Sequence, residues 1–200
     1  MTGRVRTAIL ISGRGSNMRA LIEAARRADY PAEIAIVLSD NPEAVGLTAA
    51  REDGVMAKAV DFRSFRGKQD FEAALNAHLM GAGAELVCLA GFMRILSAGF
   101  VAKWQGRMLN IHPSLLPDLR GLNTYERALA EGRTEHGCTV HYVSAELDAG
   151  PVIARARVPV LAGDDADKLA ARVLVEEHRL YSQALDMVAR ALRATASQKA

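Results

Sequence analysis

Residues 108–116 read Met108-Leu109-Asn110-Ile111-His112-Pro113-Ser114-Leu115-Leu116, and the other informative segments of the chain are arranged around them. The stretch begins as an apolar strand that carries two polar side chains, Asn110 and His112. Side chains alternate along a strand, so residues two apart share one face. We therefore expect Asn110 and His112 to point into the same cleft, with Leu109 and Ile111 packed on the opposite side.

Pro113 is expected to end this strand, because proline has no backbone N–H and holds the residue before it in an extended conformation. An amide donor beside a titratable ring suits a reaction in which negative charge develops on a carbonyl oxygen. The alternative is a strand end whose polar residues only cap a loop. The spacing of Asn110 and His112 leaves both interpretations open.

The composition is that of an ordinary globular protein: of 200 residues, 50% are hydrophobic and 24% are charged. This length predicts a single domain over residues 1–200, large enough to bury roughly 70% of the surface that the unfolded chain exposes. A net charge of +2 is too small to indicate a nucleic-acid partner, although it is compatible with a small anionic substrate. No apolar run reaches the roughly 20 residues that span a bilayer, so we expect no membrane partner.

Two features predict a cytoplasmic location. Cys88 and Cys138 lie in apolar surroundings, which is typical of buried thiols in a reducing compartment; a disulfide between them is the less favoured alternative. The first six residues, Met-Thr-Gly-Arg-Val-Arg, lack the long apolar segment and the cleavage site of a signal peptide.

Short apolar runs alternate with helical patterns along the first half of the chain. This alternation predicts an α/β fold with a doubly wound, mostly parallel sheet and with sites at the carboxyl ends of its strands. Three chemically suggestive segments fall at such ends, namely 13–17, 91–96 and 110–114. The predicted strands before the central stretch are 7–11, 33–38, 57–60 and 86–90.

The pattern changes after Asn123. Residues 137–143 and 153–158 read as two strands joined by a short loop, which predicts an antiparallel addition to the parallel sheet. Residues 164–193 follow as a long C-terminal helix with an apolar stripe. The small and polar residues 195–200 are expected to be disordered.

A glycine loop follows the first predicted strand and reads Ser12-Gly13-Arg14-Gly15-Ser16-Asn17. Because a helix pattern starts directly after it, the N–H groups of a helix end would face a ligand above the strand, as in phosphate sites. The spacing matches neither the dinucleotide fingerprint nor the P-loop. The alternative is a tight turn in which a serine or an asparagine caps the helix.

Asp148 is the remaining candidate for the chemistry, in Leu147-Asp148-Ala149-Gly150-Pro151. A carboxylate near a histidine stabilises the protonated ring and so favours a proton donor near neutral pH. The alternative is a turn aspartate next to a Gly-Pro pair.

Five segments form a signature in a fixed order: Ile11-Ser12-Gly13-Arg14-Gly15-Ser16-Asn17, Leu89-Ala90-Gly91-Phe92-Met93-Arg94-Ile95-Leu96, Leu109-Asn110-Ile111-His112-Pro113-Ser114-Leu115-Leu116-Pro117, His136-Gly137-Cys138-Thr139-Val140-His141 and Leu147-Asp148-Ala149-Gly150-Pro151. In these segments the chain resembles, almost end to end, the folate-dependent glycinamide ribonucleotide formyltransferases of purine biosynthesis. The His-Pro-Ser-Leu-Leu-Pro core and the distant aspartate are shared by the wider superfamily that uses 10-formyltetrahydrofolate. The Gly-x-Gly-Ser-Asn loop points to the glycinamide ribonucleotide branch and to a Rossmann-like formyltransferase fold.

The resemblance implies that Asn110, His112 and Asp148 are the catalytic trio of a formyl transfer. The formyl group of 10-formyltetrahydrofolate, the co-substrate, would pass to the amine of 5'-phosphoribosylglycinamide. Asn110 and protonated His112 would bind the developing oxyanion. Asp148 would hold His112 charged and help relay protons to the departing folate nitrogen. Small-molecule substrates, no metal, and a monomer or homodimer are also implied.

The resemblance also implies the binding residues. Gly15, Ser16 and Asn17 are similar to a phosphate cradle, and Glu177 matches a glutamate that contacts the ribonucleotide; the alternative for Glu177 is a solvated helix face. The alternative for Lys68, which would meet the folate tail, is a solvated helix lysine. The implied folate-binding residues, with apolar side chains flanking the pteridine, are Lys68, Met93, Arg94, Ile95, Leu96, Asn110, Val143, Glu146 and Leu147.

The chain departs from the family pattern in one loop. Asp118-Leu119-Arg120 stands where relatives usually carry an aromatic residue followed by Pro or Lys, and Asn123 and Tyr125 replace histidines found in some members. Because this loop is expected to border the substrate, the departures affect affinity more than the reaction. His141 is shared with relatives, but we expect a structural role because nothing in the sequence pairs it with the trio.

Three other functions fit parts of the pattern. A 10-formyltetrahydrofolate hydrolase uses a similar trio with water as acceptor, but such proteins add an N-terminal regulatory domain. A transfer-RNA formyltransferase would carry a further C-terminal domain. A non-catalytic folate or nucleotide sensor is possible on the same fold, because fold does not fix function, but retention of all three polar residues argues against it.

Overall fold

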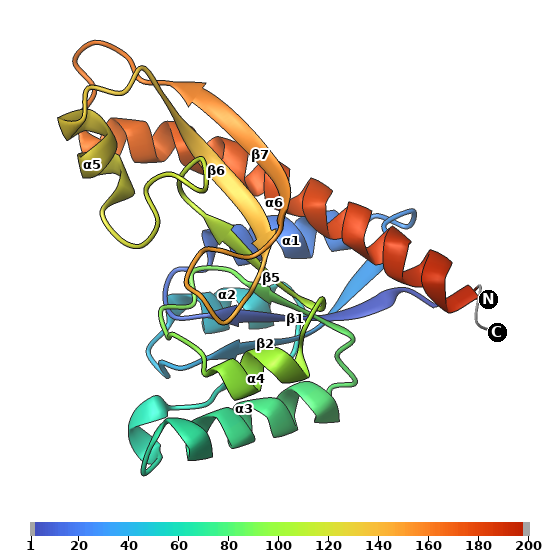
Figure 1. Ribbon diagram of the computed structural model, residues 1–200. Coiled ribbons are helices and arrows are strands. Elements are labelled where there is room, and N and C mark those ends of the chain that lie inside the picture. The colour runs from blue at the N-terminus through green and yellow to red at the C-terminus, as the bar shows by residue number, and fades with distance from the viewer. Residues whose placement is uncertain (1–2, 198–200) are drawn as a thin grey trace.

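The computed structural model describes residues 3–197 and contains a seven-stranded sheet. The chain starts in the middle of the sheet, winds outward to one edge and then returns to build the other half, giving the order β3-β2-β1-β4-β5-β6-β7 (Figure 1). The strands are β1 (Val5–Ile11), β2 (Ala32–Ser39), β3 (Ala57–Ala59), β4 (Leu86–Leu89), β5 (Met108–His112), β6 (Glu135–Tyr142) and β7 (Val152–Pro159).

Strands β1 to β5 pair in parallel with their neighbours, whereas β6 runs antiparallel to β5 and β7 runs antiparallel to β6. The winding direction reverses between β1 and β4, and ligands of open α/β sheets bind outside the carboxyl ends of the strands at such a point. The predicted doubly wound, mostly parallel sheet with antiparallel C-terminal strands is confirmed.

Helices cover both faces of the sheet (Figure 1). Strand β1 contributes to both hydrophobic cores, because Ile9 and Ile11 point to the core under α1, α2 and α6 while Ala8 and Leu10 point to the core under α3 and α4. The helices are α1 (Ser16–Ala25), α2 (Val45–Glu52), the 3-10 helix η1 (Phe62–Ser64), α3 (Lys68–Gly81), α4 (Ala98–Lys103), α5 (Thr124–Ala130) and α6 (Ala166–Ser197).

Helix α6 is anchored at the centre of the sheet by a buried tyrosine. The hydroxyl of Tyr181 lies 3.0 Å from the carbonyl oxygen of Leu89 and 3.2 Å from that of Leu109. These carbonyls belong to β4 and β5, so one side chain of α6 holds two adjacent central strands. The loops that follow these strands carry segment 91–96 and the residues after His112.

The structure differs from the sequence-based expectation at two places. Helix α6 continues to Ser197, beyond the expected end at Arg193, and residues 198–200, part of the segment expected to be disordered, lie outside the described part. The short helix η1 was not predicted. It begins at Asp61, whose side chain accepts a hydrogen bond from the N–H of Arg63, and this local capping carries no apolar periodicity.

Both cysteines are free and buried, as predicted, and burial raises the pKa of the Cys88 and Cys138 thiols to about 12. Neither thiol is therefore poised as a nucleophile. Within residues 3–197, no helix combines the length and the apolar character needed to span a bilayer.

Candidate active site

Strand β5 places Asn110 and His112 on one face, as the alternation of strand side chains predicts. His112 is 5% exposed and Asn110 is partly buried, while Leu109 and Ile111 are buried in the core on the other face. The strand ends at His112, directly before Pro113. The two polar side chains therefore lie at the carboxyl end of a central strand, where a doubly wound sheet holds its ligands.

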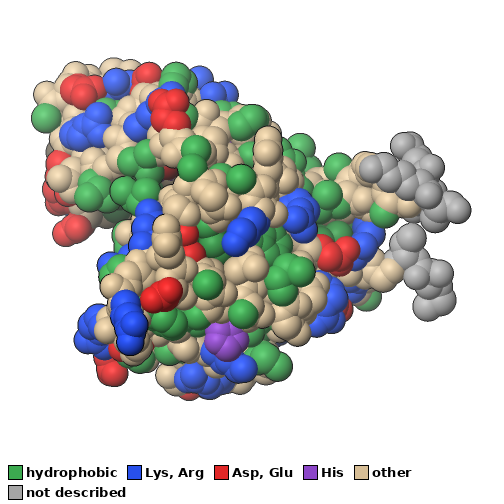
Figure 2. All heavy atoms as spheres, turned by 60° about the horizontal axis from the view of Figure 1, so that its bottom comes forward, with side chains coloured by type: hydrophobic (Ala, Val, Ile, Leu, Met, Phe, Trp, Pro, Cys, Tyr) green, Lys and Arg blue, Asp and Glu red, His purple; other side chains and the backbone are tan. Residues whose placement is uncertain are grey.

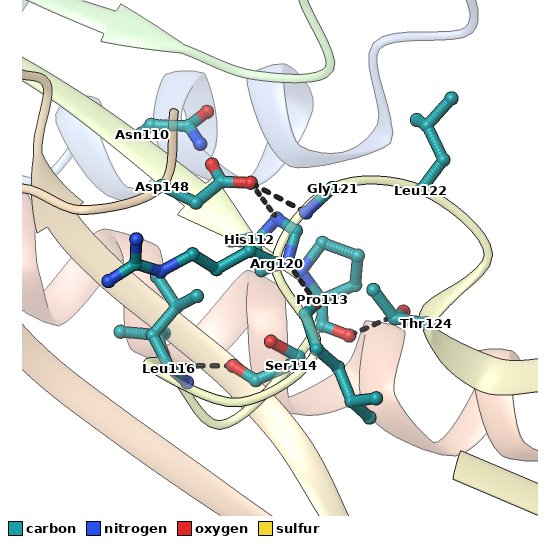
Figure 3. Close-up of polar contacts among 12 residues, drawn as sticks. Asn110, His112, Pro113, Ser114, Leu116, Arg120, Gly121, Leu122, Thr124 and Asp148 are labelled. Atoms are coloured by element: carbon teal, nitrogen blue, oxygen red, sulfur yellow. Dashed lines mark hydrogen bonds and ion pairs between the residues drawn. The ribbon is translucent and has the colours of Figure 1, made fainter. Parts of the chain in front are cut away.

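Both ring nitrogens of His112 face oxygen atoms. Nδ1 lies 3.3 Å from Oδ2 of Asp148, and Nε2 lies 3.0 Å from the carbonyl oxygen of Leu119 (Figure 3). Carboxylate and carbonyl oxygens can only accept a hydrogen bond, so an imidazolium that donates from both nitrogens satisfies the site better than either neutral tautomer.

Asp148 is buried beside His112, with a side-chain exposure of 7%. The backbone N–H of Gly121 donates to its Oδ2 over 3.0 Å. Its own backbone has φ of 50°, a left-handed conformation that is uncommon outside glycine and that clusters at functional sites. The turn interpretation of Asp148 therefore describes its backbone, while its side chain points into the site (Figure 3).

Gly150 allows this turn to lie close to strand β6. A Cβ atom at Gly150 would come within 1.7 Å of the carbonyl oxygen of Tyr142, so any side chain there would push the 143–150 loop away. The glycine after Asp148 is thus a packing requirement of the site, since only glycine permits this approach of two backbones.

His141 belongs to the same cluster, which the sequence did not indicate. It lies opposite Asn110 in the β5–β6 register, and its Nε2 is 3.2 Å from Nδ2 of Asn110 and 3.7 Å from Oδ1 of Asp148. Its Nδ1 lies 3.0 Å from the carbonyl oxygen of Tyr142 and can only donate to it. Burial lowers the pKa of His141, which favours the neutral ring with an acceptor nitrogen facing the Asn110 amide.

The loop after β5 is fixed by hydroxyl groups from two elements, β6 and α5 (Figure 3). Oγ1 of Thr139 donates to the carbonyl of Ser114 over 2.7 Å and accepts from the N–H of Leu116 over 3.0 Å. Oγ1 of Thr124 donates to the carbonyl of Pro113 over 2.7 Å. The loop that supplies the Leu119 carbonyl and the Gly121 N–H therefore starts from a fixed base.

The glycine loop leads into α1 without a side-chain cap. Gly15 is the N-cap residue, with φ of 73°, and neither Ser16 nor Asn17 caps the helix. A Cβ atom at Gly15 would lie 3.2 Å from the Cα of Gly46, and the N–H of Gly46 donates to the carbonyl of Gly13 over 3.0 Å. The capping alternative is therefore wrong, and the first N–H groups of α1 are left to another acceptor.

Asn17 and Glu177, 160 positions apart in the sequence, meet beside this loop. Nδ2 of Asn17 donates to Oε2 of Glu177 over 2.7 Å, and Oδ1 of Asn17 is buried without a hydrogen-bond partner in residues 3–197. Glu177 is 6% exposed, and burial raises the pKa of its carboxyl group. The expected alternative, a solvated helix face at Glu177, is wrong.

The segment Met93–Leu96 forms an extended loop with large apolar side chains in solvent. Met93 is 70% exposed and Ile95 is 67% exposed, whereas Leu96 is buried. The guanidinium of Arg94 lies 4.0 Å from the centre of the Phe62 ring and pairs with Asp40. Exposed apolar side chains beside buried polar groups are typical of a ligand site.

The other implied folate residues are placed less closely together. Leu147 is 52% exposed in the loop before Asp148, Val143 packs on the core under α3 and α4, and Glu146 forms an ion pair of 2.7 Å with Arg120. Lys68 is exposed at the first turn of α3 and has no ion pair within residues 3–197. In Figure 2, Lys and Arg side chains gather at one edge of the face that carries α3.

Sequence reasoning missed the residues that act through the backbone or across strands. The Leu119 carbonyl and the Gly121 N–H carry no side-chain signal, although the departure at 118–120 marked their loop. Strand alternation puts His141 on the same face as Thr139, but its partner across the sheet, Asn110, is given only by the β5–β6 register of the structure. Ser12 and Asp40, which hold the 93–96 loop, follow two different strands.

Two cavities of about 580 and 500 Å³ lie away from the trio. The first is lined by Leu116, Arg133 and Arg155 among others, and the second lies between Tyr30 and α6. The trio is therefore identified by the short distances between its polar groups and not by a large cavity. No three His, Cys, Asp or Glu side chains in the described residues lie close enough to hold a metal ion.

A doubly wound sheet with an amide, an imidazole and a carboxylate at the end of its central strand defines an α/β enzyme domain. A family model described as formyl transferase matches residues 5–185. The chain belongs to this formyl transferase family, as the five sequence segments predicted.

Several relatives agree with this assignment. A phosphoribosylglycinamide formyltransferase of Escherichia coli (strain K12) is 44% identical over 173 residues, which are 86% of this chain and 82% of that protein. The human trifunctional purine biosynthetic protein adenosine-3 is 44% identical over 93% of this chain, which spans 18% of its length. The crystal structure of a phosphoribosylglycinamide formyltransferase from Brucella melitensis has a TM-score of 0.90 at 50% identity and covers 93% of this chain and 96% of that one.

Proposed function

We propose that the protein transfers the formyl group of 10-formyltetrahydrofolate to the amine of 5'-phosphoribosylglycinamide. The observation that carries this proposal is the His112–Asp148 pair beside Asn110 at the carboxyl end of β5. The names of the bacterial relatives, which match most of their length, support the choice of substrates.

Asn110, His112 and Asp148 divide the chemistry among them. The folate supplies a formyl carbon that the amine nitrogen can attack, which places negative charge on the formyl oxygen. The amide N–H of Asn110 donates to that oxygen, an effect worth on the order of 3 kcal/mol for one donor. His112, whose ring nitrogens face Asp148 and Leu119, stabilises the same oxygen through the positive charge of its imidazolium. Asp148 keeps His112 protonated. The proton that the amine loses passes by way of these groups to the folate nitrogen as the C–N bond to the folate breaks.

The ribonucleotide would bind at the start of α1. The backbone N–H groups of Gly15, Ser16 and Asn17 lie at the start of α1, where the helix dipole is positive. Both the free donors and the positive dipole favour binding of a phosphate. Glu177 and the unpartnered Oδ1 of Asn17 provide buried acceptors beside them, which suit the hydroxyl groups of a ribose. This pairing of donors with acceptors supports a sugar phosphate as the ligand.

The folate would bind across the 93–96 loop and the 143–148 loop. Exposed Met93, Ile95 and Leu147 supply apolar contacts for a flat heterocycle, and Arg94, Lys68 and Glu146 supply charged groups around it. We further propose that residues 1–200 act as one domain in the cytoplasm, as a monomer or homodimer without a metal, on small molecules and without a nucleic-acid or membrane partner.

Incubation with 10-formyltetrahydrofolate, with and without the ribonucleotide, tests the proposal. Folate absorbance reports tetrahydrofolate, and the formylated ribonucleotide is measured separately. Equal amounts of both products, formed only when the ribonucleotide is present, are expected. Tetrahydrofolate release without the ribonucleotide would identify a hydrolase instead, and no turnover in either mixture would identify a sensor.

A further inference from the structure

A buried carboxylate links two loops that follow different strands. Asp40 lies just beyond the end of β2, and its side chain is 4% exposed. Its Oδ1 accepts a hydrogen bond from Oγ of Ser12 over 2.5 Å, and its Oδ2 accepts from Nε of Arg94 over 2.6 Å. Such short, charge-assisted bonds are about twice as strong as neutral ones. The three residues come from the loops after β1, β2 and β4.

Ser12 connects Asp40 to the backbone of the 93–96 loop. While its hydroxyl donates to Asp40, its oxygen accepts from the N–H of Met93 over 2.8 Å. The N–H of Ser12 donates in turn to the carbonyl of Gly91 over 3.1 Å. Asp40 therefore fixes the start of the loop through Ser12 and the side chain of Arg94 directly.

Arg94 is held on two sides and open on the others. Asp40 binds its Nε, the ring of Phe62 lies 4.0 Å from its guanidinium carbon, and its side chain remains 42% exposed. Arg94 uses neither Nη group in a hydrogen bond within residues 3–197. A guanidinium fixed along one edge and one face presents its remaining N–H groups in a set direction, which favours binding of a carboxylate.

We propose that Asp40 is a positioning residue for the folate site: it orients Arg94 and, through Ser12, the Met93 N–H that precedes the pteridine-binding backbone. This inference rests on the proposed function. It adds that the loop between β4 and α4, which has no regular secondary structure of its own, takes its binding geometry from a carboxylate that contacts no substrate. Preorganisation of this kind improves affinity because less order is lost on binding.

The test compares Asp40→Ala with Asp40→Asn in the full chain. Alanine removes both acceptors, so we expect the KM for 10-formyltetrahydrofolate to rise about tenfold or more, while kcat falls less than about threefold. Asparagine can still accept from Arg94 and donate to Ser12, so its KM should lie between that of the wild type and that of the alanine variant. The KM for the ribonucleotide should stay within about twofold, because Gly46 and Glu177 hold the glycine loop independently.

Asp164→Ala is the matched control. Asp164 has the same side-chain exposure of 4% and pairs with Arg172 over 2.7 Å, but it lies before α6, far along the chain from the folate loops. This variant loses a buried acidic partner of an arginine without touching Ser12 or Arg94. It should lower stability without changing the folate KM.

Titration of tetrahydrofolate by intrinsic fluorescence gives a readout independent of turnover. The double variant Asp40→Ala/Arg94→Ala should weaken folate binding by less than the product of the two single effects, because part of the effect of Asp40 acts through Arg94. Wild-type turnover with an unchanged folate KM and Kd in Asp40→Ala, or strictly multiplicative effects, would overturn the inference. Absence of formyl transfer in the wild type would overturn the proposed function instead.

Discussion

The surroundings of Glu177 determine the pKa of its carboxyl group. On the sequence it is one of two adjacent glutamates on a long helix, and in the structure it is a buried carboxyl group bound to Asn17. Burial without a nearby cation disfavours the charged form, which is why its pKa is raised. A buried carboxyl group with a raised pKa lowers stability at neutral pH, which makes Glu177 a candidate for ligand binding.

Replacement of this group should change the pH dependence of stability. A carboxyl group with a raised pKa in the folded state stabilises the fold below its unfolded pKa, and this contribution is lost as pH rises through the folded pKa. Glu177→Gln removes the titration but keeps an acceptor for Asn17. We expect the free energy of unfolding of the variant, relative to the wild type, to increase between about pH 4 and pH 7. Urea denaturation at both pH values measures it, and a difference that does not change with pH would contradict this account.

Asn17 is a second residue whose replacement tests the proposed ribonucleotide site. Asn17→Ala removes a buried acceptor and the donor that holds Glu177, so the KM for the ribonucleotide should rise by about tenfold with a smaller change in kcat. Gln183→Ala removes an exposed amide from α6 and serves as the control. An unchanged KM in Asn17→Ala would return the glycine loop to a purely structural role.

At the scale of elements, Tyr181 connects α6 to the strands that carry the site. Tyr181→Phe keeps the packing but leaves the Leu89 and Leu109 carbonyls without their side-chain donor. We expect a loss of about 1–2 kcal/mol in the free energy of unfolding, measured by urea denaturation. Tyr142→Phe is the control, because the Tyr142 hydroxyl makes no hydrogen bond within residues 3–197. Equal stability of Tyr181→Phe and the wild type would show that these contacts do not hold the helix.

Most elements could be predicted because the apolar runs of a parallel sheet are short, continuous and separated by helical periods. This pattern alone was enough to predict the strand that ends at His112 and the helix that follows the glycine loop. The register that puts His141 opposite Asn110 could not be predicted, because strand alternation gives the face of a residue but not its partner across the sheet. The left-handed backbone at Leu119 carried no signal either, since leucine rarely adopts this conformation.

At the scale of the molecule, the candidate active site lies where the parallel and antiparallel halves of the sheet meet. Strand β5 pairs in parallel with β4 and antiparallel with β6, so the carboxyl ends of β1, β2, β4 and β5 lie along one edge of the sheet. The loop between β6 and β7 reaches this edge through the contacts of Asp148 with His112 and Gly121. Asp40 joins the loops on one side, and Asp148 joins His112 to the Gly121 loop on the other. The trio comes from β5 and from the loop between β6 and β7, so no single element contains it.

The measurement that bears most directly on the trio is the single-turnover rate of formyl transfer in the wild type, His112→Asn, Asp148→Asn and the double variant. Under the proposed function His112 and Asp148 act as one pair, so each single change should slow transfer by about 10²–10³-fold, and the double variant should be no slower than the slower single one. Ribonucleotide binding should remain within about twofold in all three, since the glycine loop is separate. A rate near the wild type in His112→Asn, or a double variant whose loss is the product of both, would contradict the account.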